Sequence, residues 1–181
     1  LVVLVVYVRD EFGLLQLSNV SEAFFRNAPL SDLRQDRLCY PALLNCSKFV
    51  PAEGKPLSWI CTQHLEREPL LREQDEARRV RMGFVALLRC LLESGFNYSS
   101  EVHEASSWFS ESRKVIRQIA TVEAWEKASE KDSAFACEMP WLETGLTANE
   151  VIDRIFGNLK CARRPVLTSG DMARIVMNSA Q

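Results

Sequence analysis

The sequence has few of the features that mark catalytic or nucleic-acid-binding chains. It contains only two histidines, His64 and His103, and they lie in different segments. Its seven scattered glycines form no phosphate-binding loop, nucleophile elbow or dinucleotide fingerprint. A net charge of −2 leaves no basic surface of the kind that attracts nucleic acid. We therefore expect no enzyme, no cofactor and no nucleic-acid partner.

The apolar run at the start of the chain is too short to cross a membrane as a helix. It covers residues 1–8, whereas a spanning helix needs about 20 residues. It can be a buried β-strand, the end of a truncated transmembrane or signal segment, or an apolar anchor that packs against a partner. Its valines and tyrosine favour the strand, and its abrupt start favours truncation. As an interaction surface we expect this run together with a later apolar patch: Leu1, Val3, Val5, Tyr7, Trp141 and Leu142.

The cysteines leave the redox compartment open. The even count of six suits a disulfide framework, but a chain of this length and charge does not require one. Cys90 lies in an apolar helical run, where a reduced thiol packs as a small hydrophobe. Three N-x-S sequons, at Asn19, Asn45 and Asn97, would matter only if the chain were secreted. Packed thiols and disulfides both remain open.

One grouping has the composition of a metal site, and it consists of Cys39, Cys46, Cys61 and His64. The pair Cys61 and His64 has a chelating spacing on one helical turn. Six residues separate Cys39 from Cys46, where two to four are usual in a zinc knuckle. The spacing therefore argues against a zinc site, and packed thiols are the favoured interpretation.

Hydrophobic periodicity predicts helices along most of the chain. The strongest signal covers residues 69–93, where apolar side chains recur at intervals of three and four and Gly95 follows the end. A second long stripe runs over 100–131. Shorter helices are expected from Ser18 or Ser21 to Ala28, over 32–44, over 149–159 and from Thr168 onward. In Thr147-Ala-Asn-Glu150 the spacing is that of a capping box, which opens the helix at 149.

The C-terminal helices enclose a loop of specific length. A loop at 160–171 has twelve residues, with Leu167 at its eighth position and Asp171 at its last. In this pattern residues 146–176 resemble the helix-loop-helix of the EF-hand, or calmodulin-like, family. A generic capped helical hairpin is the alternative interpretation.

The loop departs from the EF-hand pattern at the positions that bind calcium. Lys160, Ala162 and Arg164 stand where the family places oxygen ligands, and Pro165 replaces the turn glycine. The resemblance therefore implies a degenerate EF-hand, with no calcium bound at 160–171.

Together these patterns predict a mainly α protein, an irregular helical bundle with a short N-terminal strand or truncated apolar segment. We expect an apolar segment at 1–17, a helical core at 18–145 and a C-terminal helical hairpin at 146–181. The favoured function is a non-enzymatic accessory subunit that contacts other protein subunits, in an intracellular or organellar assembly with or without membrane association. The alternatives are a calcium-independent EF-hand regulatory module and a secreted, disulfide-bonded helical glycoprotein.

Overall fold

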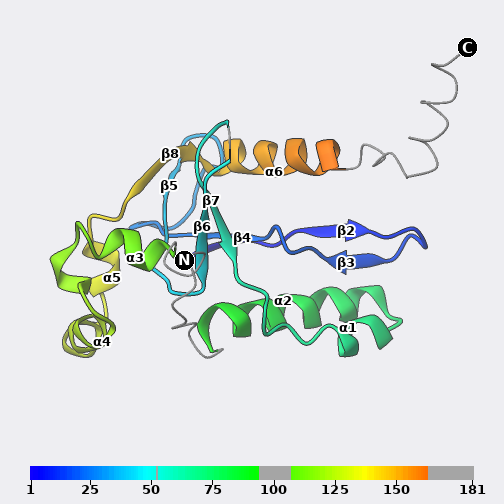
Figure 1. Cartoon of the computed structure of the whole chain (residues 1–181), viewed down its shortest axis with the longest axis horizontal. Helices are drawn as coiled ribbons and strands as arrows, with labels where there is room; N and C mark the ends of the chain where they lie inside the picture. The colour runs from blue at the N-terminus through cyan, green and yellow to red at the C-terminus, as the bar shows by residue number, and fades with distance from the viewer. Residues whose placement is uncertain (52, 94–106, 163–181) are drawn as a thin grey trace, which may run out of the picture.

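The computed structural model describes residues 1–51, 53–93 and 107–162. This part of the chain is an α+β fold (Figure 1). Its elements, in chain order, are β1 (Val2–Leu4), β2 (Tyr7–Arg9), β3 (Leu15–Leu17), β4 (Glu22–Phe24), β5 (Arg37–Cys39), β6 (Cys46–Phe49), β7 (Leu57–Ile60), α1 (Glu68–Arg72), α2 (Glu76–Leu92), α3 (Trp108–Ser112), η1 (Arg117–Ile119), α4 (Val122–Lys131), α5 (Phe135–Glu138), β8 (Glu143–Thr147) and α6 (Ala148–Ala162).

The prediction of a mainly helical bundle is wrong. The described residues contain eight strands, arranged as a four-stranded antiparallel sheet in the order β1-β4-β7-β6 and the two-stranded pairs β2-β3 and β5-β8. Strand β4 replaces the helix expected up to Ala28, and β5 lies within the one expected at 32–44. The strands are three to five residues long, so they are too short to show a clear alternation of apolar and polar residues.

The N-terminal apolar run forms strands that are covered on both faces. Strand β1 pairs with β4, and its side chains alternate between two clusters. Val3 and Val5 pack on the core cluster that contains residues of α2, whereas Val2 and Leu4 pack on the cluster that contains residues of α6. Figure 1 shows the four-stranded sheet between these two helices. The strand is apolar at every position because each face packs on one of these clusters. The β-strand interpretation is confirmed, although the residues of β1 are half-buried rather than fully buried.

The helix expected at 69–93 is interrupted near its start. Asp75 accepts a hydrogen bond from the backbone N–H of Arg78 at 2.6 Å and so caps α2 separately from α1. Arg79 is 4% exposed, although it is charged, and its Nε donates to the carbonyl oxygen of Glu73 at 2.7 Å. The side chains of Asp75 and Arg79 thus stabilise the break between α1 and α2.

The long helix expected at 100–131 is also divided. Residues 100–106 lie outside the described residues, and the remainder forms α3, η1 and α4. Ser107 accepts from the backbone N–H of Ser110, and Thr121 accepts from that of Ala124, so each side chain caps a new helix. The apolar side chains do recur at helical intervals, but Ser107 and Thr121 each begin a new, shorter helix within this segment.

The β2-β3 hairpin lies against α2 at a glycine. The hydroxyl of Tyr7 donates to the carbonyl oxygen of Val80 at 2.6 Å, and a Cβ on Gly83 would lie 2.9 Å from that hydroxyl. At the outer end of the hairpin, Arg9 forms an ion pair with Glu76 at 2.9 Å. The close approach of Tyr7 therefore requires glycine at position 83.

A buried ion pair joins α6 to the four-stranded sheet. Arg154 of α6 donates to both carboxylate oxygens of Glu22 on β4 at 2.7 Å. The Glu22 side chain is 1% exposed and that of Arg154 is 17% exposed. The carboxylate also accepts the backbone N–H of Ser58 on β7 at 2.9 Å. The buried carboxylate thus has hydrogen-bond donors from both α6 and β7.

Removing one member of this pair should cost far more than removing both. We expect Arg154→Met to lower the free energy of unfolding by about 3–5 kcal/mol, because a buried carboxylate would lose its counter-charge. The double variant Glu22→Gln/Arg154→Met should recover most of that loss. Urea unfolding of the three chains measures the difference, and equal losses in the single and double variants would contradict it.

The two described helix-interior glycines, Gly83 and Gly157, should respond oppositely to alanine. A Cβ on Gly157 would meet nothing within 4 Å, so Gly157→Ala should stabilise the protein by up to about 1 kcal/mol through helix propensity. Gly83→Ala should lose this benefit and destabilise the protein by about 1–3 kcal/mol, because Tyr7 must move. Thermal unfolding of the two matched variants checks this, and equal stabilisation in both would show that Tyr7 yields freely.

Candidate functional site

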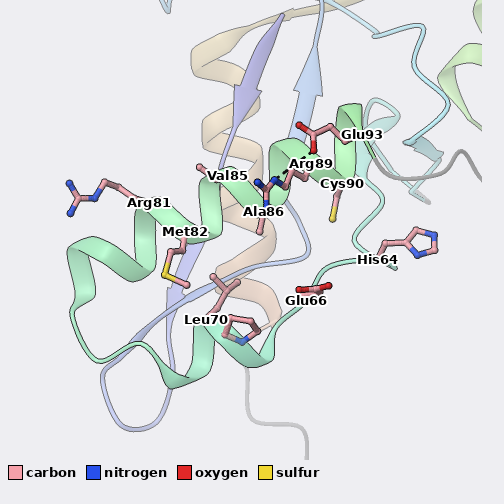
Figure 2. A pocket seen from close by; sticks show the side chains of 11 residues that line it. His64, Glu66, Leu70, Arg81, Met82, Val85, Ala86, Arg89, Cys90 and Glu93 are labelled. Carbon is pink, nitrogen blue, oxygen red and sulfur yellow. Dashed lines mark ion pairs between the residues drawn. The ribbon is translucent and has the colours of Figure 1, made fainter.

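A groove of about 640 Å³ lies between α2 and the segment that leads into α1. Its apolar lining comes from Pro69, Leu70, Met82, Val85 and Ala86. Figure 2 shows Met82 pointing from α2 toward Leu70, whereas Arg81 points away from the centre of the groove. The space is therefore lined mainly by hydrocarbon, as in a site that receives an apolar side chain.

Charged groups of both signs lie along the rim of the groove. Arg89 and Glu93 form an exposed ion pair at 3.6 Å, one helical turn apart. Arg81 forms no ion pair with any residue in the described ranges, and Glu66 is likewise without one there. An unpaired cation beside an apolar surface can select an acidic partner without contributing much affinity.

The outer face of α2 carries a second set of apolar side chains, which we call the α2 outer stripe: Phe84, Val85, Leu88 and Leu92. Phe84, Val85 and Leu92 are 43%, 47% and 52% exposed, and Leu88 is half-buried. The inward face is formed instead by Gly83, Leu87 and Leu91, which are buried. A surface helix normally has a polar face opposite its buried stripe, so this second apolar set is unusual.

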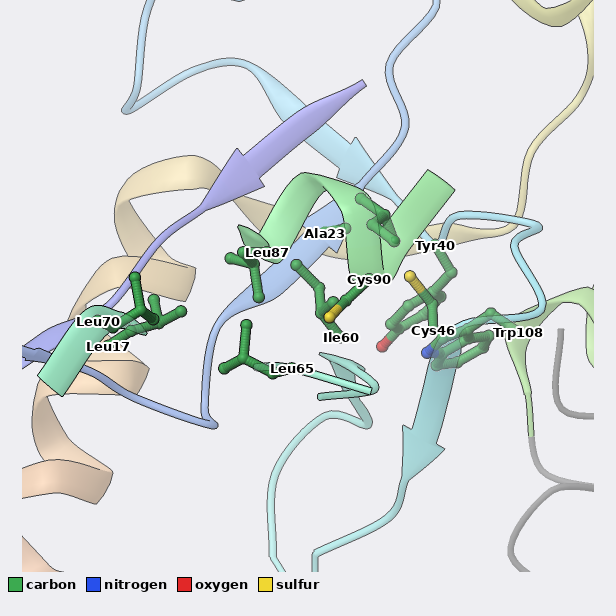
Figure 3. Close-up of a cluster of buried hydrophobic side chains, with 11 residues drawn as sticks. Leu17, Ala23, Tyr40, Cys46, Ile60, Leu65, Leu70, Leu87, Cys90 and Trp108 are labelled. Atoms are coloured by element: carbon green, nitrogen blue, oxygen red, sulfur yellow. The ribbon is translucent and has the colours of Figure 1, made fainter. Parts of the chain in front are cut away.

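A cysteine and a histidine line the groove, and this raises the question of thiol chemistry. Burial raises the pKa of the Cys90 thiol above its ordinary value, whereas a catalytic cysteine requires a lowered one. Cys90 belongs to the main core cluster and is 3% exposed (Figure 3). Cys90 is therefore a packed thiol that forms part of the groove wall.

Most of the sequence-predicted interaction residues make contacts within the chain. Val3, Val5, Tyr7 and Leu142 pack on the core cluster that contains Leu87. Trp141 is buried in a separate cluster, in which it contacts the rings of Phe25 and Trp125 and which we call the aromatic cluster. Leu1 is exposed. The exposed apolar surface on α2 was missed because the sequence places Phe84 and Leu88 in the same periodic stripe as the core residues.

The four candidate zinc ligands do not come together. No group of three or more potential ligands in the described ranges could hold a metal ion. Cys46 lies buried in the main core cluster, whereas Cys39 contacts the aromatic cluster and His64 lines the groove. Short strands and turns, rather than a zinc knuckle, connect these positions.

No disulfide joins any of the cysteines whose side chains are described: Cys39, Cys46, Cys61, Cys90 and Cys137. In one of the three sequons the asparagine side chain already has a structural role. Asn45 is buried, and its amide donates to the carbonyl oxygen of Cys90 at 2.9 Å. A glycan on Asn45 would require this bond to break and the side chain to leave the core. Asn19 is exposed, and Asn97 lies outside the described residues.

The capping box that opens the C-terminal helix is confirmed. Glu150 accepts the backbone N–H of Thr147 at 2.7 Å, and Thr147 accepts that of Glu150 at 3.3 Å. Helix α6 continues through residues 160–162, which are the first three positions of the twelve-residue loop in the EF-hand comparison. Residues 163–171 of that loop lie outside the described residues.

The buried state of Cys90 should be visible in its reactivity. Alkylation of the folded chain by iodoacetamide at pH 8 should modify the exposed Cys137 at least about tenfold faster than Cys90, because a raised pKa leaves less thiolate. Mass spectrometry of the digested chain separates the two sites. After denaturation in guanidinium the rates should converge. Rapid modification of Cys90 in the folded chain would instead indicate an activated thiol.

Comparisons of the chain with protein-family models, with curated proteins and with solved structures found no match. In the described ranges no helix combines the length and the apolar character needed to cross a membrane. The function must therefore be inferred from the exposed surface of the fold.

Proposed function

We propose that this protein is a non-enzymatic interaction subunit that joins a larger protein assembly through the outer face of α2. The observation that carries the proposal is the α2 outer stripe, with three of its four side chains between 43% and 52% exposed. Isolated exposed hydrophobic residues are common on protein surfaces, but a contiguous apolar set on one helix face marks an interaction site.

The spacing of three stripe residues and the neighbouring Arg81 favours a helix as the partner. Arg81, Val85, Leu88 and Leu92 follow one another at intervals of four, three and four residues. This is the spacing by which side chains of one helix fit between those of another. A partner helix with apolar residues at the same intervals would cover the stripe and leave the charged groups at its margins.

The adjoining groove extends the same surface. Val85 belongs to both features, since it lines the groove and is exposed on the stripe. In α1, Leu71 is 61% exposed, so apolar surface is also present on the neighbouring helix. The arrangement supports packing of a protein surface across α1 and α2 rather than enclosure of a small substrate.

The chemistry of the groove also supports binding over catalysis. Its cysteine thiol is buried and has a raised pKa, and its floor consists of hydrocarbon side chains. In the described ranges no cluster of metal-binding side chains accompanies it. A reaction site would require a nucleophile or a positioned acid–base pair at such a surface.

Replacing exposed stripe residues should release the chain from its assembly without unfolding it. The double variant Val85→Gln/Leu92→Gln should keep the free energy of unfolding within about 1 kcal/mol, because both side chains are already about half exposed. In extracts of cells that make the protein naturally, gel filtration should show the unaltered chain above its own mass of 20.6 kDa. The double variant should elute at that mass.

A matched control uses exposed apolar residues away from α2. Val115→Gln/Phe156→Gln removes side chains that are 63% and 58% exposed, and it should leave the assembly intact. The proposal fails if the unaltered chain elutes as a free monomer, or if the α2 variant remains assembled as well as the control does.

A further inference from the structure

We propose that the helix received by α2 is α2 of a second copy of this chain, in an antiparallel arrangement about a twofold axis. This inference rests on the proposed function and names the partner. It follows from the order of the side chains along the stripe and from the charges at its two ends.

The stripe is complementary to itself. Arg81, which lies on the same helix face, and the stripe residues Val85, Leu88 and Leu92 have intervals of four, three and four residues. This spacing reads the same in both directions along α2, with the midpoint between Val85 and Leu88. Two antiparallel copies aligned at this midpoint place Val85 beside Leu88 of the second copy and Arg81 beside its Leu92. Such self-complementarity is what a closed twofold dimer requires, because the same patch must serve on both subunits.

The charges complement one another in the same alignment. Arg81, which has no ion-pair partner in the described ranges, would lie next to Leu92 and hence close to Glu93 of the second copy. The twofold axis repeats this contact, so the dimer would contain two such pairs. A parallel arrangement would instead place Arg81 beside Arg81, which disfavours it.

Glu93 is available for this contact. Among the described residues it pairs only with Arg89, at 3.6 Å, and the two side chains are 69% (Arg89) and 71% (Glu93) exposed. Exposed pairs of this kind contribute little to stability, so exchanging the partner costs little. Arg89, when released, would lie opposite Phe84 of the second copy, where a guanidinium can stack on an aromatic ring.

The test uses the purified full chain and two charge-reversal variants, Arg81→Glu and Glu93→Arg. Light scattering coupled to gel filtration at roughly 100 μM should show the unaltered chain at twice its mass of 20.6 kDa. Each single variant should dimerise at least about tenfold more weakly, because its homodimer brings two pairs of like charges together.

An equimolar mixture of the two variants provides the decisive test of the charge pairing. In the mixed dimer both end contacts again join opposite charges, so its dissociation constant should return to within about threefold of that of the unaltered chain. Circular dichroism of each variant confirms that the fold is retained. A chain carrying both substitutions should also dimerise, since every reversed position then faces a reversed position.

Each outcome decides the inference. A monomeric unaltered chain overturns it, as does a dimer that is insensitive to both reversals, which would form through another surface. Single variants that are weakened but not rescued by mixing overturn the antiparallel alignment. If the purified chain is monomeric while the native extract shows an assembly that depends on the stripe, only the second-copy inference fails and the proposed function stands.

Discussion

The ion pair between Glu22 and Arg154 connects two parts of this fold that lie far apart in sequence. It joins β4, at the centre of the sheet, to α6, and 132 residues separate its two members. The apolar residues around it cover one face of the sheet, and the carboxylate also holds β7 through the backbone N–H of Ser58. The opposite face packs on the cluster that contains residues of α2, so the sheet lies between the two helices.

The sequence predicted some of these elements well. The capping box at Thr147 and Glu150 identified the start of α6, because its hydrogen bonds involve only residues three apart. The helical character of α2 was equally clear from its long apolar periodicity. Its boundary with α1 was missed, since the contact of Arg79 with the Glu73 carbonyl depends on a local fold that periodicity does not report.

The sheet could not be predicted from the same patterns. A half-buried strand alternates between apolar and polar side chains, but strands enclosed between two helices are apolar on both faces. Strand β4 has only three residues, two of them apolar, so its sequence fits a fragment of a helix equally well, and in such a helix Glu22 would be an ordinary surface acid. Only its pairing with Arg154, far along the chain, makes Glu22 part of the interior.

The candidate surface was missed for a related reason. Phe84, Leu87, Leu88 and Leu91 recur at helical intervals, so the sequence assigned them to one buried face. In the structure Leu87 and Leu91 point into the core, while Phe84 is 43% exposed and Leu88 is half-buried. The two sets differ by about 60–100° around the helix axis, and only the positions of the sheet and hairpin show which set is covered.

The wide separation of Glu22 and Arg154 also constrains how the chain acquires its structure. The β1-β4 ribbon can form early, because its strands are close in sequence, but one of its faces stays uncovered until residue 154 has been synthesised. Until then a valine-rich strand and an unpaired carboxylate are exposed together. A nascent chain is therefore more prone to aggregation as long as α6 is not yet available to cover this face.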